Sequence, residues 1–473
     1  QVDQTRRTYA AAISANHSLS LYLDRLEKGR SATPRSWLYE NKASKEVLQS
    51  WLQILSTLKD GGPEMEKIYQ FDTSQIQKWG PMGEIPPIDQ AIETLAEQYE
   101  VSAYDRWEPL FPESQLEDIA KQIAPQFYRR LRPLSFKAVV DDMRDRDTLT
   151  TNSGYPDFGR RSKPEILQKA IQDAESKRAY EYPAIVLFRS YYGKLRPVWM
   201  YPMAMNLIEN SFTQAIQRVL PESQNELTSE YVTPWIGFED VKQVFTRQWN
   251  EFRTAFGGDT TAMDAHFRLA QMATVYHCVK HWFQQEHWPE LERCMRHVNE
   301  IDLLTGKTKM LAGAHGISSG SGWTQLSETI FQLILFFSGM NDRPYREKSS
   351  RWDAVPRRGQ GIGDDFVWFF SVPTATEAVT ARFDRVGLPA NPKKQSNESG
   401  SCTFLQRLFL TKYPSRENPA VLGGIYPTIR ALNSSIHPER FHDPEKWNSD
   451  MFCIRQYMIL ENTVDHPLFE EFV

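Results

Sequence analysis

The sequence has few cysteines, no long apolar run and little net charge, and each shortage argues against a class of protein. The four cysteines among 473 residues are widely spread, which disfavours a disulfide scaffold and leaves no zinc-ligand spacing. No run of about 18 apolar residues occurs, so we expect no transmembrane helix. The first residues lack the apolar core of a secretion signal, and a reducing, intracellular setting fits this chain.

The composition is that of a large globular protein, with 40% hydrophobic and 12% aromatic residues over a length that allows several subdomains. The net charge of −5 argues against nucleic-acid binding only if the total is considered. The distribution of charge matters more than its sum. Basic residues form three clusters: Arg129, Arg130 and Arg132; Arg160, Arg161 and Lys163; and Arg343, Arg346, Lys348, Arg351, Arg357 and Arg358. This distribution suits a positive channel inside a negative shell.

A Gly-Asp-Asp tripeptide, Gly363-Asp364-Asp365, separates two runs of β-forming residues and predicts a tight strand-turn-strand. Adjacent anions in an apolar setting repel each other and are costly to desolvate unless a cation joins them. A hard divalent metal with oxygen ligands, Mg²⁺ above all, is the expected compensation. Taken alone, the tripeptide also fits an ordinary hairpin turn.

A second carboxylate pair, Asp259 and Asp264, lies upstream. Its spacing of five predicts a strand that ends near Asp259 and turns into a helix continuing to Phe283. Alone, the two would be a turn residue and a charge at a helix N-terminus. Together with Asp364, they predict a two-metal site for phosphoryl transfer.

Two further helices are indicated by the pattern of apolar residues. Between the carboxylate pairs, small residues at 316–322 predict a mobile loop, and Thr324 opens a helix. Without the carboxylates this segment would be a Gly/Ser loop before a core helix. Upstream, residues 205–220 predict an amphipathic helix that ends at Pro221.

The order Asp-x4-Asp, Ser-Gly-x3-Thr and Gly-Asp-Asp resembles motifs A, B and C of viral RNA-dependent RNA polymerases. Further segments resemble other motifs of that family in the same order: Thr151-Asn152-Ser153-Gly154-Tyr155-Pro156 motif G, Arg189 with Lys194-Leu195-Arg196-Pro197 motif F, Gly387-Leu388 with Asn391-Pro392-Lys393-Lys394 motif D, and Phe404-Leu405-Gln406-Arg407 motif E. The resemblance spans residues 151 to 407. It is closest to the small double-stranded RNA viruses, picobirnavirus-like first and partitivirus-like second, on the runs 319–324, 363–368 and 424–430.

The resemblance implies an α+β, right-hand polymerase with fingers, a thumb and a palm built on an antiparallel sheet flanked by helices. An N-terminal extension would close the channel. The implied divisions are 1–110 for an extension bridging fingers and thumb, 111–197 for fingers, 198–290 for palm, 291–312 for a fingers insertion, 313–405 for palm, and 406–473 for thumb and C-terminal tail.

The resemblance also implies roles for single residues. Asp259 and Asp364 would hold two Mg²⁺ ions, which Mn²⁺ could replace, with Asp365 as a secondary ligand. The implied nucleotide-binding residues are Arg189, Lys194 and Arg196 at the triphosphate, and Asp264, Ser319, Gly320, Thr324 and Glu328 around the sugar. Either Lys393 or Lys394 would protonate the leaving pyrophosphate. The implied RNA contacts are Thr151, Ser153, Gly154, Pro156, Arg160 and Arg161 for the template, and Arg407 for the product.

Glu328 departs from the pattern of many positive-strand virus polymerases, which carry Asn four residues after the motif B Thr. An ionised Glu accepts a hydrogen bond from a sugar hydroxyl but cannot donate one. Ribose selection would then rest on Asp264, Ser319 and Thr324. Glu328 either takes part in the site or is a charge on the exposed face of its helix.

The implied activity is template-directed synthesis of RNA that replicates and transcribes a viral genome. The implied partners are template and nascent RNA, ribonucleoside triphosphates and capsid protein, for a monomer in the virion interior and host cytoplasm. A reverse transcriptase is the nearest alternative, although it lacks a motif G and a Ser-Gly-x3-Thr loop. A catalytically idle RNA-binding or capsid-associated protein on the same scaffold is another. A phosphohydrolase is disfavoured because neither pair has Asp-x-Asp spacing.

Overall fold

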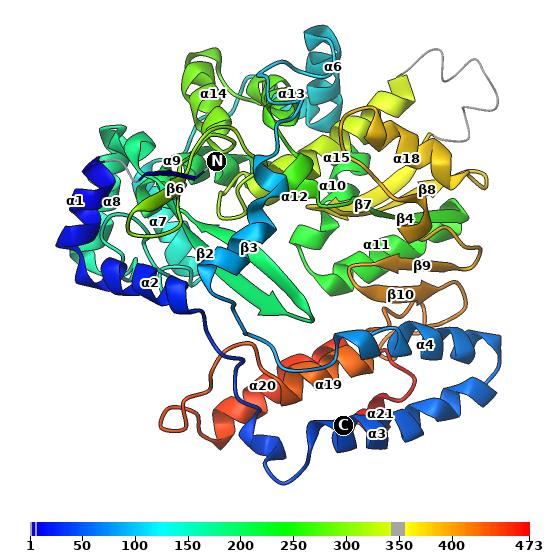
Figure 1. The fold of residues 1–473 in the computed structure, drawn as a ribbon. Coiled ribbons are helices and arrows are strands. Elements are labelled where there is room, and N and C mark those ends of the chain that lie inside the picture. Colours follow the sequence, from blue (N-terminus) through cyan, green and yellow to red (C-terminus); the bar gives the residue numbers. More distant parts are fainter. Residues whose placement is uncertain (1, 5–6, 342–354) are drawn as a thin grey trace.

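The structure, a computed structural model, describes residues 2–4, 7–341 and 355–473. Arg343, Arg346, Lys348 and Arg351 of the third basic cluster lie outside these residues. Within the described part, strands form sheets of order β1-β6-β5-β2-β3, β4-β8-β7 and β9-β10 (Figure 1). The strands are β1 Val2–Gln4, β2 Ala184–Tyr191, β3 Lys194–Met200, β4 Thr254–Asp259, β5 Leu303–Leu304, β6 Lys309–Leu311, β7 Arg358–Ile362, β8 Asp365–Phe370, β9 Ser401–Phe404 and β10 Arg407–Leu410.

Helices supply the rest of the regular structure. They are α1 Arg7–Ala15, α2 His17–Lys28, α3 Ser44–Leu55, α4 Pro63–Thr73, α5 Ile88–Ala91, α6 Glu113–Ile123, α7 Phe136–Asp145, α8 Pro164–Glu175, α9 Met203–Val219, α10 Glu226–Tyr231, α11 Phe238–Glu251, α12 Met263–His266, α13 Leu269–Val279, α14 Trp288–His297, α15 Thr324–Asn341, α18 Thr376–Asp384, α19 Thr428–Ile436, α20 Ser449–Asn462 and α21 Phe469–Phe472. None of the described helices is long and apolar enough to span a membrane.

The antiparallel sheet β4-β8-β7 is buried on both faces, and strand alternation decides which residue faces which layer. Phe366 and Trp368 of β8 join the large core with helices α15 and α18. Val367 and Phe369 point to the other face and pack with α11 and the β9-β10 hairpin. Figure 1 shows α15 and α18 on one side of this sheet and α11 on the other. The sheet is therefore held rigidly from both sides.

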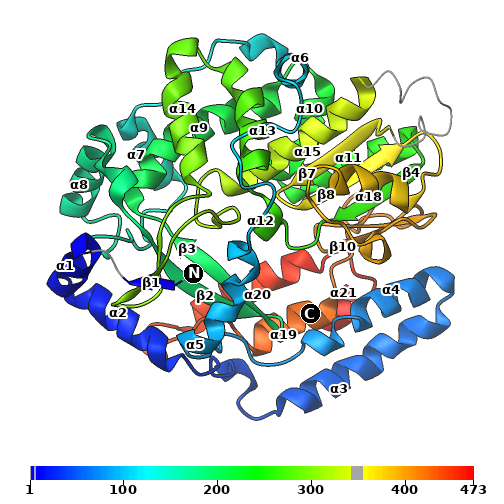
Figure 2. The same ribbon diagram turned by 45° about the horizontal axis from the view of Figure 1, so that its top comes forward.

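The N-terminal segment joins two distant parts of the molecule. Strand β1 pairs with β6 at the edge of the five-stranded sheet. Helices α3 and α4 lie beside α19, α20 and α21 in both ribbon views (Figures 1 and 2). Between them, Gly80 N donates to Asn433 Oδ1 of α19 (2.9 Å) and Gly83 N donates to the Ser190 carbonyl of β2 (2.7 Å). One segment thus contacts both the β2-β3 hairpin and the C-terminal helices.

The C-terminal region is anchored by two buried carboxylates. Asp465 accepts hydrogen bonds from Lys242 Nζ (3.0 Å) of α11, Ser415 Oγ (2.8 Å) and two backbone amides. Asp72 of α4 contacts His466 Nε2 at 2.9 Å and accepts from Thr428. The residues following α20 are therefore part of a core shared with α4 and α11.

Two predictions made from short stretches of sequence are confirmed by the structure. The Gly-Asp-Asp turn does join two antiparallel strands, and Thr324 does open a helix. The helix predicted from Asp264 to Phe283 is wrong as one element, because it breaks into α12 and α13. Arg268, the residue that caps α13, has an extended backbone, and its N–H donates to the Gln271 side chain. Its guanidinium meanwhile binds carbonyls of the N-terminal segment, at Glu97 and Glu100.

We expect Lys242→Ala to destabilise the fold strongly, because it leaves the buried Asp465 carboxylate without its cation. Removing one partner of a buried ion pair costs about 3–5 kcal/mol. A thermal melt measures the effect. Lys121→Ala, which removes an exposed i,i+4 pair with Glu117, is the matched control and should shift the midpoint little. Equal shifts for the two variants would contradict the anchoring role of Asp465.

Candidate active site

The register of β4 against β8 brings the predicted carboxylates together. Asp259, the last residue of β4, lies opposite Asp365, the first residue of β8. Directly opposed residues on antiparallel strands have Cα atoms about 4.5–5.5 Å apart. The preceding Gly258 is required here, because a Cβ would come within 1.9 Å of the Phe366 ring. Close packing of the two strands therefore fixes the position of Asp259.

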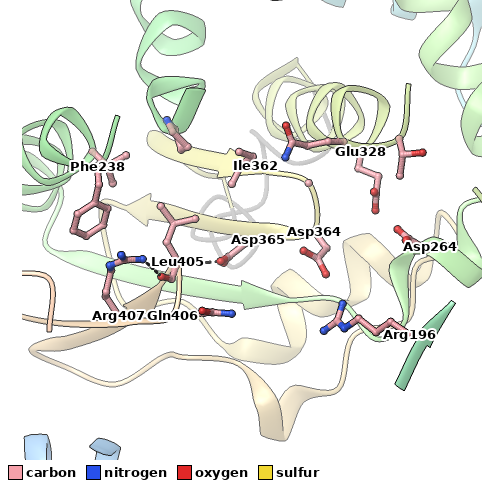
Figure 3. A pocket seen from close by; sticks show the side chains of 15 residues that line it. Arg196, Phe238, Asp264, Glu328, Ile362, Asp364, Asp365, Leu405, Gln406 and Arg407 are labelled. Atoms are coloured by element: carbon pink, nitrogen blue, oxygen red, sulfur yellow. Dashed lines mark hydrogen bonds between the residues drawn. The ribbon is translucent and has the colours of Figure 1, made fainter. Parts of the chain in front are cut away.

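The turn residue Asp364 points into a cavity of about 570 Å³ (Figure 3). The residues that line it are Arg196, Pro234, Phe238, Val241, Asp264, Thr324, Gln325, Glu328, Ile362, Gly363, Asp364, Asp365, Leu405, Gln406 and Arg407. Apart from Pro234, Phe238 and Val241, they belong to or adjoin the segments that resemble motifs A, B, C, E and F. Asp259 is outside this lining, but the charge of Asp364 contributes to raising its pKa.

Burial and mutual repulsion raise the pKa values of these acids. Burial is the larger cause for Asp365, whose pKa rises to about 8, and Asp364 is the next. The Leu405 N–H, which donates to Asp365 Oδ2 at 3.0 Å, works against this shift. The pKa values of Asp259 and Asp364 are also raised, mainly by burial. A cation in the cavity would relieve the repulsion.

Helix α15 braces the turn that carries Asp364. Thr329 Oγ1 accepts a hydrogen bond from the Gly363 N–H (2.9 Å), and the Gln332 amide donates to the Gly363 carbonyl. Gln332 also accepts from the buried Tyr231 hydroxyl at 2.9 Å. Because α15 also carries Thr324 and Glu328, one rigid helix sets both the turn and the opposite wall of the cavity.

Asp264 and Glu328 form a buried acid pair. Figure 3 shows their carboxyl groups turned toward each other, and they share a hydrogen bond. Burial raises the pKa of Asp264 to about 6, and burial followed by repulsion from Asp264 raises the pKa of Glu328 well above its usual range. The alternative of an exposed charge is wrong for Glu328, since its side chain is 4% exposed. A protonated Glu328 can donate a hydrogen bond, which the ionised form cannot.

Basic side chains of strand β3 and of a short 3₁₀ turn act on these acids. Arg196 and Lys194 both lower the pKa values of Asp264 and Asp364, and Arg196 lines the cavity. Lys394, in the short 3₁₀ turn Pro392–Lys394, lowers the pKa of Asp259. Both predicted lysines are exposed, and Lys394 is the one whose charge acts on Asp259.

The oxygen donors at this site fit a divalent cation such as Mg²⁺. Asp259, Asp364 and Asp365 are hard oxygen ligands on neighbouring strand ends. No three His, Cys, Asp or Glu side chains of the described ranges are gathered closely enough to hold a metal unaided. Mg²⁺ is commonly held by one or two carboxylates, with water and substrate phosphates completing the shell. Water and a phosphate ligand would therefore complete the shell of a cation held by these carboxylates.

Some predicted residues lie away from the cavity. Arg189 makes two hydrogen bonds to Glu439, at 3.0 and 2.8 Å, and does not line the cavity. Ser319 donates to the Pro197 carbonyl (3.4 Å), and Gly320 packs on Trp199. Neither lines the cavity. Arg407 does line it, yet its guanidinium donates to the Leu405 carbonyl and to Asn462 of α20.

The motif G segment is a compact loop. The Ser153 hydroxyl accepts from the Gly159 N–H (3.1 Å), Gly154 has a φ of +68°, and the Pro156 carbonyl accepts from Asn16. Arg161, predicted as an RNA contact, donates to the Asn152 carbonyl and to Asn206 Oδ1 within the chain. Of this predicted set, Thr151 and Arg160 are exposed.

Sequence reasoning missed Gln395. Its amide donates to the Asp259 carbonyl (2.6 Å) and accepts from the Asp259 N–H (2.8 Å), which clamps the backbone of the carboxylate. The next residue, Ser396, continues this contact by pairing with Gly257. In the sequence, only the adjacent Lys393-Lys394 pair marked this segment as functional. That pair predicted proton transfer and not a contact with the Asp259 backbone.

We expect Asp365→Asn to gain stability over the unchanged chain as the pH rises from 5 to 8 in the absence of divalent ions. The pKa of Asp365 rises from 3.8 to about 8 on folding, so its bound proton stabilises the fold fully below pH 4. That stabilisation is lost as the pH rises to about 8, at no more than about 1.4 kcal/mol per pH unit. Thermal melts at several pH values measure the difference.

Asp141→Asn, at an exposed position, is the control and should show no such trend. Added Mg²⁺ should raise the melting midpoint of the unchanged chain at pH 8 more than that of Asp365→Asn. A difference between the Asp365 variant and the unchanged chain that stays constant with pH would contradict the raised pKa.

No family model matches the chain. A potential RNA-dependent RNA polymerase of Human picobirnavirus (strain Human/Thailand/Hy005102/-) is 25% identical over 480 residues, covering 97% of this chain and 84% of that protein. The crystal structure of the RNA-dependent RNA polymerase of a human picobirnavirus has a TM-score of 0.81 at 22% identity, over 99% of this chain and 88% of that one. Its insertion loop deletion mutant gives 0.80 at 22% identity, over 99% and 91%.

These relatives are named RNA-dependent RNA polymerases, and such polymerases are nucleotidyltransferases. The solved structures have the α+β polymerase fold that the motifs predicted. The resemblance also extends over nearly the whole chain, beyond the motif region of 151–407. The predicted likeness to the picobirnavirus RNA-dependent RNA polymerases is therefore confirmed in sequence and in fold.

Proposed function

We propose that this chain is an RNA-directed RNA polymerase that copies a viral RNA template by adding ribonucleotides to a growing 3′ end. The observation that carries the proposal is the convergence of Asp259, Asp364 and Asp365 on adjacent strand ends, opposite Arg196 and Lys194. A nucleotide triphosphate needs this combination, because metal-bound carboxylates and basic side chains share the charge of its phosphates.

Asp259, Asp364 and Asp365 would hold the divalent cations. Bound Mg²⁺ would acidify the 3′-hydroxyl and neutralise charge on the phosphates. The protein's own part is to hold these carboxylates in position. Gln395 clamps the Asp259 backbone, the Leu405 N–H fixes Asp365, and α15 braces the turn at Asp364.

The basic residues bind and orient the triphosphate. Arg196 and Lys194 face the acids from the β2-β3 hairpin, and Arg suits bidentate contact with phosphate oxygens. Arg189 is paired with Glu439 and is left out of this role. Lys394 is the better placed of the two lysines to give a proton to the leaving pyrophosphate, since its charge acts on Asp259.

The acid pair of Asp264 and Glu328 selects the sugar. Glu328 carries the proton and donates it in the hydrogen bond to Asp264. The lone pairs of Asp264 that this bond does not use can accept a hydrogen bond from a ribose 2′-hydroxyl. Glu328 in this protonated form does the work of the Asn found at this position in positive-strand virus polymerases.

The N-terminal extension closes the channel. The bridge from β2 through Gly83 and Gly80 to α19 supports the division into fingers, palm, thumb and a bridging extension. With this division, template and nascent RNA would pass between the β2-β3 hairpin and the C-terminal helices.

We expect Asp364→Ala to reduce ribonucleotide incorporation by at least about a thousandfold while leaving RNA binding nearly unchanged, because the lost carboxylate serves the reacting phosphates. The assay supplies a template, four ribonucleotides and Mg²⁺ or Mn²⁺, with and without primer. Asp141→Ala, at an exposed site, is the control. Absence of synthesis by the unchanged chain would support the idle scaffold, and a preference for deoxyribonucleotides would support a reverse transcriptase.

We expect Glu328→Gln to keep ribose discrimination, because a neutral amide donates and accepts as the protonated acid does. Glu328→Leu should lower discrimination against deoxyribonucleotides by about tenfold, the value of roughly one hydrogen bond. Competition between a ribonucleotide and its deoxy analogue measures the ratio. Equal ratios for the two variants would remove Glu328 from sugar selection.

A further inference from the structure

Glu209 is a buried carboxylate that neither the motifs nor the proposed chemistry uses. It lies in α9 beside the apolar stripe that predicted this helix, and its side chain is fully buried. It faces the loop 318–322, which precedes α15 and contains the Ser-Gly of motif B. A buried carboxylate is costly unless donors surround it, so its position calls for an explanation.

Three donors converge on this carboxylate. Oε1 accepts from the Gly322 N–H at 3.1 Å and from Asn206 Nδ2 at 2.9 Å, while Oε2 accepts from the Ser321 hydroxyl. Two of the three come from the loop, and one of these is a backbone N–H. The contact therefore fixes the path of the loop backbone as well as one side chain.

Asn206 extends the network to the motif G loop. Its amide nitrogen also donates to the Gly320 carbonyl (3.4 Å), and its oxygen accepts from Arg161 (2.9 Å). Arg161 in turn holds the Asn152 carbonyl at 3.1 Å. Glu209 is therefore part of a chain of hydrogen bonds that connects the motif G segment with the loop 318–322.

The loop is also pressed against its surroundings. A Cβ on Gly320 would come within 1.6 Å of the Trp199 carbonyl, and one on Gly322 within 2.3 Å of Asn210 Oδ1. The backbone contact requires glycine at position 320, whereas a side chain at position 322 would first displace the Asn210 amide. Beyond the loop, the Thr324 hydroxyl binds the Ser318 carbonyl, so the wall of the cavity depends on where the loop lies.

We propose that Glu209 is a positioning residue for nucleotide binding, which holds the loop 318–322 so that Thr324 and the start of α15 face the cavity. The inference rests on the proposed polymerase function and adds a residue outside the motifs to it. Glu209 touches no reacting group itself. It acts by accepting hydrogen bonds from Gly322, Ser321 and Asn206.

The electrostatic surroundings fit a group that works in either protonation state. Burial raises the pKa of Glu209 to about 7, opposed by Ser321, Gly322, Asn206 and the charge of Arg161. The other titratable groups that its charge affects are the buried Tyr201 and Cys294, whose pKa values are raised. The protonated acid has the shape and hydrogen-bonding groups of an amide, so Gln can replace it: the oxygen accepts from Gly322 and Asn206, and the NH₂ donates to Ser321.

The test compares Glu209→Met, which keeps the volume and removes the acceptors, with Glu209→Gln, which keeps the hydrogen bonds. We expect Glu209→Met to raise KM for ribonucleotides about tenfold or more with a much smaller change in kcat, since buried donors lose their partners. Glu209→Gln should stay within about threefold of the unchanged chain. The matched control is Ser211→Ala, on the same helix and equally buried, whose hydroxyl binds only the Ile208 carbonyl.

Hydrogen exchange at the Gly322 amide gives a readout that needs no activity. Its protection should fall in Glu209→Met and persist in Glu209→Gln and Ser211→Ala. If the unchanged chain makes no RNA, the proposed function fails, whereas the exchange result still decides the position of the loop. Unchanged KM and protection in Glu209→Met would overturn the inference, as would a Gln variant as impaired as the Met variant.

Should Glu209→Met not fold, Ser321→Ala tests the same contact from the loop side. It should raise KM about threefold, the effect of one lost hydrogen bond. Combined with Glu209→Gln it should raise KM by the same factor, because Gln keeps the contact that Ser321→Ala removes. An unchanged KM in Ser321→Ala would overturn the inference.

Discussion

The fold has to accommodate repulsion among five acidic side chains that lie close together. Asp264, Glu328, Asp364 and Asp365 line one cavity, Asp259 lies on the neighbouring strand end, and the pKa of each is raised. Folding pays for this concentration of acids with apolar packing on both faces of the β4-β8-β7 sheet. The acids are thereby held ready for cations and phosphates that the folded chain alone does not supply.

Hydrogen bonds from several uncharged side chains hold the acidic residues in place. Thr329 and Gln332 hold the turn at Asp364 by hydrogen bonds, and Gln395 holds the backbone of Asp259 in the same way. None of these side chains carries a charge. Neutral amides and hydroxyls can fix an anion's backbone without cancelling the charge that the site needs, which explains why the braces are Gln and Thr rather than Arg or Lys.

The parts of the site that the sequence predicted are those encoded by short-range patterns. The Gly-Asp-Asp turn and the strand end at Asp259 follow from alternation and turn residues within ten positions. The partner of Asp264 lies 64 residues away, so its burial could not be read locally. Arg189 and Arg161 looked like phosphate contacts, and only the fold shows that Glu439 and Asn206 engage them. Glu209 gave no signal, since one acidic residue beside an apolar stripe is ordinary in an amphipathic helix.

The buried pair of Lys242 and Asp465 has a consequence for the chain's far end. Asp465 also receives the backbone amides of Arg416 and Gly424, and its neighbour His466 reaches Asp72. A truncation before Thr463 would deprive these donors of their acceptor and leave the buried ammonium group of Lys242 with Glu239 as its remaining carboxylate partner. The residues that follow α20 therefore stabilise the packing of α4, α11 and α19. Removing them would weaken the contacts of all three helices.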